Sequence, residues 1–298
     1  MWLVVGRPDC AEDGESGHPV AWCFGVKSCG GKAELLWCMD IETGFGMLGK
    51  VGLGILGVVA AGLLIWWIIK EAEKAAARAA ARIAAMEAFA DQFGFSFVRS
   101  QDPMHDDEFS HFEIFRRGFA RYAYNSIVGD IDLGEVIARL KAGDFSYKTK
   151  ETYTTTDSKG RTRTRTRIVK HHFSYMILEL PFPTMPDLMI RREGIFDRIA
   201  SAFGKNDIDF ESAEFSKKYY VKCDSRKFAY DIVNQRMIEF LLETKPGLVD
   251  IEHGRICLSD GYSVWNADRF GASLGWILKF LEHWPGFVVE DLQEGKQL

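Results

Sequence analysis

Hydrophobic and polar positions divide the chain into regions of clearly different pattern. From Val51 to Ile69, nineteen residues carry no charge, and Lys50 and Lys70 close this run on its two sides. As a helix the run would be about 28 Å long, close to the ~30 Å hydrocarbon thickness of a bilayer. The pattern therefore predicts one transmembrane helix over residues 47–69, with the lipid bilayer as its partner. A buried core helix of the same composition is the alternative.

The basic residues around this run predict its orientation. Lys and Arg recur every fourth residue after it, whereas a comparable stretch before it contains only Lys32 and Lys50. The positive-inside rule then places the C-terminal side in the cytoplasm of a single-pass protein of the cell (inner) membrane. The residues expected to flank the membrane are Lys50, Lys70 and Lys74.

Residues 70–94 have the composition of a helical stalk. They are mostly Ala, Glu, Lys and Arg, and Gly94 is the first Gly or Pro after the span. These residue types favour helix, so we expect one uninterrupted helix from about Leu48 to Phe93. A narrow apolar stripe on it is expected to dock on the following domain rather than to pair with a second copy, although a homo-oligomer stays an open alternative. The stripe consists of Ile83, Met86, Phe89 and Phe93.

Residues 1–46 differ from the rest of the chain, since four cysteines lie there among Gly, Pro and acidic residues without an apolar period. We expect an unstructured tail, or a start of translation that really lies at Met39 or Met47. No C-x-x-C pair occurs, which disfavours zinc, and an oxidising environment would allow three disulfide pairings. The cysteines are Cys10, Cys23, Cys29 and Cys38.

Residues 95–298 predict a soluble α+β domain with antiparallel strands and about three helices, either as one unit or as two lobes, 95–205 and 206–298. Alternating patterns predict strands over 121–131, 135–141, 144–156, 161–180 and 217–222, with a turn at Asp157–Gly160 and a hairpin through His253-Gly254. Helical spacing and caps predict helices over 195–203, from Asp224 or Ser225 to Glu243, and after Asn266.

The composition is that of an ordinary globular protein once the span is set aside. The chain has 298 residues, is 47% hydrophobic and carries a net charge of −5. Only Cys223 and Cys257 fall in the soluble part, which fits a reducing compartment.

The order of these segments resembles that of bacterial single-pass membrane-anchored proteins of uncharacterised function. The resemblance rests on the span, the Ala-rich basic helix, the Gly-Phe-x-Phe sequence of Gly94–Phe97, and Phe215–Val221 leading through Asp224 into a helix. It extends from about Met47 to Trp284. It implies a topology and brings no catalytic residues with it.

One motif and one group of residues suggest catalysis. Gly271–Gly275 matches the G-x-S-x-G pattern of a hydrolase nucleophile around Ser273, but it lies inside a predicted helix, so helix packing explains it better. A metal-dependent hydrolase is the alternative function, in which carboxylates on one face of a strand and nearby histidines would bind the ion. Its candidate residues are Asp207, Asp209, Glu211, His105 and His111. The wet face of an edge strand explains the carboxylates better, and a solvated loop explains the histidines better.

The basic hairpin carries the functional prediction. Arg161, Arg163, Arg165 and Arg167 alternate with Thr, and an even-length loop would place Lys150 on the same face. Because such like charges repel, a negative partner is expected, either anionic lipid headgroups or a membrane-associated protein. Nucleic acid is disfavoured because no aromatic residues alternate with the arginines.

A solvated hairpin without a partner is the alternative. The sequence thus predicts a membrane-tethered cytoplasmic binding or scaffold module that uses no cofactor.

Overall fold

The computed structural model describes residues 41–134, 136–158, 160–182, 184–193 and 208–296. The chain divides into two compact units, Met1–Lys74 and Ala75–Leu298. The predicted helix at 195–203 and the four N-terminal cysteines lie outside the described residues.

Helix α1 (Ile41–Gln92) is one uninterrupted helix, which confirms the prediction of a continuous span and stalk. It is long and apolar enough to cross a membrane, by length and composition. The helix begins at Ile41, whereas residues 41–46 were predicted to belong to the unstructured tail. No Gly or Pro after Gly62 interrupts the helical run, in agreement with its regularity.

Among the described residues, eight strands form one antiparallel sheet in the order β1-β2-β3-β4-β8-β7-β5-β6. The strands are β1 (Ser96–Val98), β2 (Phe119–Asp132), β3 (Ile137–Thr156), β4 (Thr162–Glu179), β5 (Leu188–Arg192), β6 (Tyr219–Cys223), β7 (Leu248–Glu252) and β8 (Arg255–Ser259). The α+β class is confirmed. Strand β5, from the first half of the domain, lies between β7 and β6 from the second half, so the strands of both halves share one sheet.

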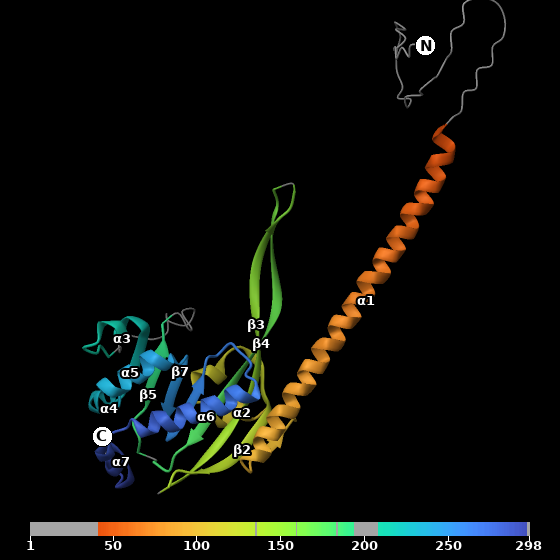
Figure 1. Cartoon of the computed structure of the whole chain (residues 1–298). Coiled ribbons are helices and arrows are strands. Elements are labelled where there is room, and N and C mark those ends of the chain that lie inside the picture. The colour runs from red at the N-terminus through yellow and green to blue at the C-terminus, as the bar shows by residue number, and fades with distance from the viewer. Residues whose placement is uncertain (1–40, 135, 159, 183, 194–207, 297–298) are drawn as a thin grey trace, which may run out of the picture. The chain divides into compact units, whose positions relative to one another are not determined.

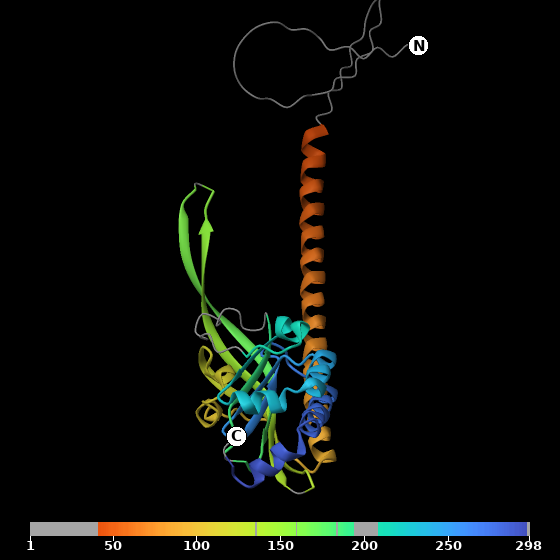
Figure 2. The same ribbon diagram turned by 90° about the vertical axis from the view of Figure 1, so that its left-hand side faces the viewer.

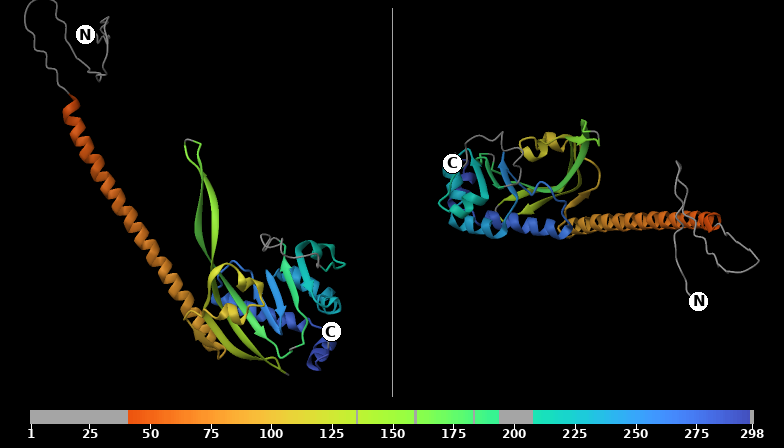
Figure 3. Two further views of the ribbon diagram at one scale, coloured as in Figure 1. Left: turned by 180° about the vertical axis from the view of Figure 1, so that it is seen from behind. Right: turned by 90° about the horizontal axis from the view of Figure 1, so that it is seen from above.

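Helices cover the two faces of this sheet unequally (Figure 3). One face is covered by the end of α1 together with most of the later helices, and the other by a short segment before β2. The helices are α2 (His105–Glu108), the 3-10 helix η1 (Glu113–Arg116), α3 (Ala213–Lys218), α4 (Arg226–Ile232), α5 (Gln235–Thr244), α6 (Ala267–Glu282) and α7 (Gly286–Gln293).

Capping residues define most of the helix ends. The side chains of Ser225 and Asn266 accept hydrogen bonds from the backbone N–H groups of Phe228 and Arg269, as predicted for helix starts. The helix expected to run to Glu243 is in fact two helices, α4 and α5. Asn234 separates them by capping α5, because its side chain satisfies an N–H of the new first turn.

The apolar stripe of the stalk docks on the sheet within the second unit, as predicted. Met86 and Phe89 are buried in the larger core cluster, whereas Phe93, in the turn just after the helix, remains 48% exposed. The compact unit begins at Ala75, so the second half of the stalk belongs to the domain. The Ala75–Leu298 unit thus contains its own core on both faces of the sheet.

Candidate functional site

Strands β3 and β4 extend well past the other strands of the sheet (Figures 1 and 2). They pair without interruption from Arg139 opposite Glu179 to Thr156 opposite Thr162. Burial ends at Tyr147 on β3 and resumes at Phe173 on β4. We call residues 148–170, between these points, the hairpin arm.

The register of the arm corrects the predicted placement of Lys150. Thr156 pairs with Thr162, so the loop of residues 157–161 has an odd length, and Lys150 lies opposite Ile168. Successive residues of a strand point to opposite faces. Lys150 therefore lies on the face opposite to Arg163, Arg165 and Arg167.

The arginine face carries fewer uncompensated charges than predicted. Arg167 forms an ion pair with Glu151 at 2.9 Å, and its guanidinium lies over the ring of Tyr153 at 5.8 Å. Arg161 lies in the loop, where it pairs with Asp157 at 3.2 Å.

Arg163 and Arg165 are exposed, and no acidic side chain among the described residues forms an ion pair with either. These two arginines are the available cations of this face.

A second set of cations lies on the other face, close to the sheet. Lys148 is directly opposite Lys170, an arrangement of like charges that does not stabilise a hairpin. Lys150 lies over the ring of Phe119 at 5.8 Å. Next to it, Ile168 is 62% exposed. This face thus combines positive charge with exposed apolar surface.

The charge of the arm contrasts with that of the whole chain. Residues 148–170 contain eight Lys and Arg but only two acidic residues, a net charge of +6 within a chain of net charge −5. A segregated charge of this kind generates a local positive potential that attracts an anionic surface.

A buried polar network fixes the base of the arm to α1. Asp144 of β3 accepts two hydrogen bonds of 2.8 Å from the guanidinium of Arg82, one from Asn125 at 3.0 Å and one from Ser174 at 2.6 Å. Arg82 also donates to the backbone carbonyl of Trp265 at 2.7 Å. The arm therefore starts from a fixed position relative to the end of the stalk.

The residues considered for metal binding do not come together. Asp209 and Glu211 are exposed in an irregular segment before α3, and not on the expected strand, while Asp207 lies outside the described residues. His105 lies on the other side of the sheet, enclosed by Phe109, Phe115, Phe145 and Tyr175. No group of three His, Cys, Asp or Glu side chains in the described part of the chain could hold a metal ion.

His105 and His111 both pack against aromatic rings. Burial lowers the pKa of His105 to about 2 and, with the nearby Arg255, that of His111 to about 4. Both rings are therefore neutral near pH 7. His111 packs edge-on against the ring of His253. The Nε2 atom of each ring is buried and has no hydrogen-bond partner among the described residues.

The remaining predicted residues occupy ordinary positions. Lys70 pairs with Glu73 at 2.9 Å and Lys74 with Glu71 at 3.9 Å on the surface of α1. Lys50 lies on α1 as well. Ser273 is buried inside α6 and not at a turn between a strand and a helix, so the G-x-S-x-G match is not a hydrolase nucleophile. The expected close packing at both glycines is not found, since a Cβ at Gly271 would lie 3.5 Å from Phe89 and one at Gly275 would have no neighbour within 4 Å.

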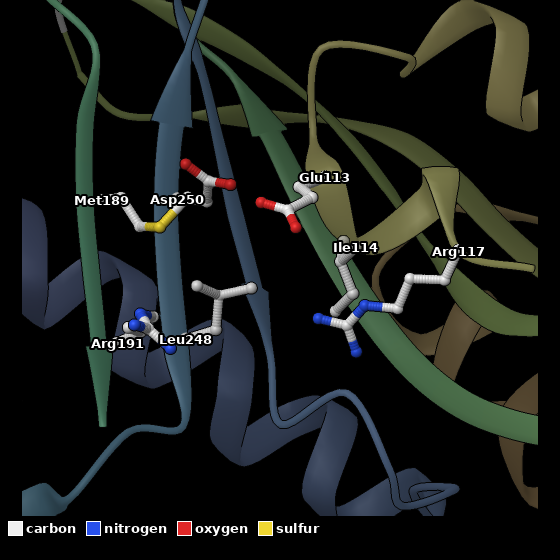
Figure 4. A pocket seen from close by; sticks show the side chains of 7 residues that line it. All are labelled: Glu113, Ile114, Arg117, Met189, Arg191, Leu248 and Asp250. Atoms are coloured by element: carbon white, nitrogen blue, oxygen red, sulfur yellow. The ribbon is translucent and has the colours of Figure 1, made fainter. Parts of the chain in front are cut away.

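A pocket that was not predicted lies between η1 and strands β5 and β7 (Figure 4). Glu113 and Arg117 form one wall, and the side chains of Met189, Arg191 and Asp250 form the other. These residues come from segments far apart in the sequence, and no local pattern marks them.

Comparisons with known proteins add little to this geometry. No protein-family model matches the chain, and no curated protein matches it significantly. Among solved structures, the chain resembles the crystal structure of the mycobacterial trehalose monomycolate transport factor A, TtfA, with a TM-score of 0.41 and 12% identity. The match covers 68% of this chain and 96% of that one. At this distance the match carries no argument about function.

Proposed function

We propose that this protein is a single-pass, membrane-tethered binding module whose hairpin arm engages the anionic surface of the membrane that anchors it. The soluble domain lies in the cytoplasm in this proposal, as the excess of Lys and Arg after the span favours. The single observation that carries the proposal is the projecting arm with its unpaired arginines.

The direction of the arm supports contact with the membrane. Phe95, just after α1, packs on Gly129, which is paired with Leu140. Arg82, nearer the span, binds Asp144 further along β3. Within the second unit, α1 traced back toward the span and β3 traced toward the arm therefore run in the same direction.

The lengths of the two segments make this contact feasible. From the Arg82–Asp144 pair, twelve residues of helix lead back to Lys70, a distance of about 18 Å. Twelve residues of strand lead from the same pair to Thr156, at about 3.3 Å each or roughly 40 Å. The arm is thus about twice as long as the helical segment between Arg82 and Lys70.

The chemistry of the arm suits a membrane surface. Each Lys or Arg near an anionic leaflet contributes about 1 kcal/mol. Tyr153 and Ile168, 41% and 62% exposed, add an aromatic and an aliphatic group that suit the interface. An acidic surface of a membrane-associated protein would use the same arginines but would not need the exposed isoleucine.

Vesicle sedimentation tests the proposal. The Ala75–Leu298 unit, which contains the whole core, is mixed with vesicles of neutral lipid or of neutral plus anionic lipid, at low and at physiological salt. We expect binding only to the anionic vesicles, and weaker binding at physiological salt because the screening length falls to about 8 Å. Arg163→Gln together with Arg165→Gln should weaken it by up to about 2 kcal/mol.

The matched control removes the same charge elsewhere. Arg226→Gln together with Arg236→Gln changes two exposed cations of α4 and α5, far from the arm in the sequence, and should leave binding unchanged. Equal loss in both variants would show that only net charge matters. Absence of binding to anionic vesicles at low salt would exclude lipid and leave an acidic protein as the partner.

Orientation requires a separate test with the full chain in cells. Protease added to intact cells should leave the C-terminal domain undigested and should degrade it only after permeabilisation. Digestion from outside would reverse the proposed topology.

A further inference from the structure

Three lysines lie together at the base of the hairpin arm, on the face opposite to Arg163 and Arg165. Lys148 of β3 is directly opposite Lys170 of β4, and Lys150 is two residues further along β3. Side chains directly opposite each other have Cβ atoms about 4.5 to 5.5 Å apart, and a step of two residues along a strand is about 7 Å. The three ammonium groups, which we call the lysine cluster, can therefore reach one bound group.

The described part of the chain offers no carboxylate to the lysine cluster. No acidic side chain there forms an ion pair with any of the three lysines, and Glu151, next to Lys150 in the sequence, lies on the other face and pairs with Arg167. Like charges directly opposite each other destabilise a pair of strands. An anion between Lys148 and Lys170 would replace this repulsion by attraction.

A bulge in β2 turns two aromatic rings toward the lysine cluster. Phe119 pairs with Lys148 and Tyr122 pairs with Ser146, so three steps along β2 correspond to two steps along β3. Both rings therefore lie on one face, whereas residues three apart in a regular strand point to opposite faces. Within the bulge, Ala120 has a φ of +51°, a conformation that favours glycine. Bulges of this kind re-aim side chains next to functional sites.

The two rings orient the lysine side chains. The Nζ atom of Lys150 lies 5.8 Å from the ring centre of Phe119, and that of Lys170 lies 5.8 Å from the ring centre of Tyr122. Both distances fit a cation–π contact. A contact with a ring leaves the charge of an ammonium group uncompensated, and each such group has three hydrogen-bond donors. The cluster thus retains donors for a ligand.

A phosphate monoester matches this arrangement. It has a charge of about −1.5 to −2 at pH 7 and three strong acceptor oxygens. These oxygens can accept hydrogen bonds from Lys148 and Lys170 at once, and hydrogen bonds between ionised groups are the strong ones. A phosphodiester or a carboxylate has a single negative charge and fewer free oxygens, so neither neutralises both lysines.

We propose that the lysine cluster binds a phosphate monoester group. Two sources supply this chemistry, the headgroup of phosphatidic acid and a free phosphate ester such as glycerol 3-phosphate. The site lies on the opposite face of the arm to Arg163 and Arg165. The proposal therefore does not depend on the membrane contact of those arginines.

Calorimetry on the full chain in an uncharged maltoside detergent tests the proposal. The probe is glycerol 3-phosphate, and the matched control probe is dimethyl phosphate, a diester, at the same physiological ionic strength. We expect saturable binding of glycerol 3-phosphate and at least about tenfold weaker binding of dimethyl phosphate, because the diester loses a charge-assisted hydrogen bond.

Lipid in the detergent micelles distinguishes the two sources. The micelles contain phosphatidic acid or, at equal total charge, phosphatidylglycerol, whose phosphate is a diester. If the source is a lipid headgroup, phosphatidic acid should suppress binding of glycerol 3-phosphate and phosphatidylglycerol should not. If the source is a free phosphate ester, neither lipid should suppress it. Equal suppression by both lipids would show that the cluster responds to charge alone and would overturn the proposal.

Variants assign the binding to the lysine cluster. Lys148→Gln and Lys170→Gln should each weaken binding of glycerol 3-phosphate about tenfold or more, since each removes a charge-assisted hydrogen bond. Arg163→Gln with Arg165→Gln is the matched control on the other face and should leave this binding unaltered. The same control should lose vesicle binding, which keeps failure of the lysine site distinguishable from failure of the arm's membrane contact.

Thermal unfolding without ligand separates a binding role from a structural one. Lys148→Gln should unfold at the same temperature as the parent or higher, because it removes repulsion between like charges. A clear fall in unfolding temperature for both lysine variants would overturn the proposal. The other results that would overturn it are no saturable binding of glycerol 3-phosphate in the millimolar range, equal binding of dimethyl phosphate, and unchanged affinity in both lysine variants.

Discussion

Arg82 and Asp144 form a bidentate ion pair that joins the helix leading from the span to the strand leading to the hairpin arm. Both hydrogen bonds are 2.8 Å long, and the side chain of Asp144 is completely buried while that of Arg82 is 20% exposed. The residues are 62 positions apart in the sequence. Because Asn125 and Ser174 also donate to this carboxylate, the pair is the centre of a satisfied network and not an isolated contact.

Breaking this pair should destabilise the domain strongly. Arg82→Met leaves the buried carboxylate of Asp144 without its cation, which should cost about 3 to 5 kcal/mol. Urea unfolding of the Ala75–Leu298 unit measures the change.

A double-mutant cycle tests whether the two residues act as a unit. Arg82→Met with Asp144→Asn should cost less than the sum of the single changes by about 0.5 to 3 kcal/mol. Strict additivity would show that the two residues act independently.

Docking of the stalk makes a second prediction. Met86 is fully buried, whereas Phe93 is 48% exposed on the same helical stripe. Met86→Ala should therefore lower the free energy of unfolding by about 2 to 5 kcal/mol, because it leaves a cavity against the sheet. Phe93→Ala is the matched control.

The control should cost clearly less, since much of the Phe93 ring already contacts solvent. Urea unfolding of both variants makes the comparison. Similar small losses in the two would mean that the stalk is not part of the domain core.

Local patterns predicted the two strands of the hairpin arm but not the register in which they pair. The alternating Arg and Thr residues correctly indicated two paired strands. The loop was expected to have an even length, but Asp157 donates its backbone N–H to the carbonyl of Arg161, and Gly160 has a φ of +75°. The resulting five-residue loop moves Lys150 to the other face, because a shift of one residue reverses every side chain.

The residues of the sites were harder to predict because they come from distant segments. Arg82 and Asp144, like Glu113 and Asp250, meet only after the sheet has formed, and no periodicity connects them. The division between α4 and α5 had a local signal, since Asn234 is a good N-cap inside an apolar helical pattern. The apolar residues before and after Asn234 keep the spacing of one helix, so the pattern predicted a single continuous helix.

The third prediction concerns how the free energy of unfolding depends on pH through the carboxyl group of Glu252. Burial and the nearby Asp187 raise its pKa from 4.5 to about 7. The folded state therefore binds this proton more tightly than the unfolded state. The contribution to stability is complete below about pH 4.5 and is lost as the pH rises through 7.

Comparison with Glu252→Gln isolates this group, because the neutral histidines His105 and His111 affect both proteins equally. Urea unfolding at intervals between pH 4.5 and 8 should show the parent losing stability relative to the variant as the pH rises. Curves that stay parallel over this range would contradict the raised pKa.

Ile168 provides the last prediction, which distinguishes insertion of the arm into the lipid interface from contact through charge alone. Its side chain is 62% exposed among threonines and lysines, where it contributes nothing to the core. At a membrane it can enter the boundary between headgroups and acyl chains, and this part of the binding does not depend on charge. High salt, with a screening length of about 3 Å at 1 M, removes the charge-dependent part.

Ile168→Thr should therefore weaken vesicle binding that remains at high salt by several-fold, since burying about one methylene group is worth ~0.8 kcal/mol. Ile137→Thr is the matched control, because Ile137 is 68% exposed at the opposite end of β3. Thr suits a strand, so neither change should alter the free energy of unfolding. If both variants bind as the parent does at every salt concentration, the arm meets the membrane through charge alone, and Ile168 does not enter the bilayer.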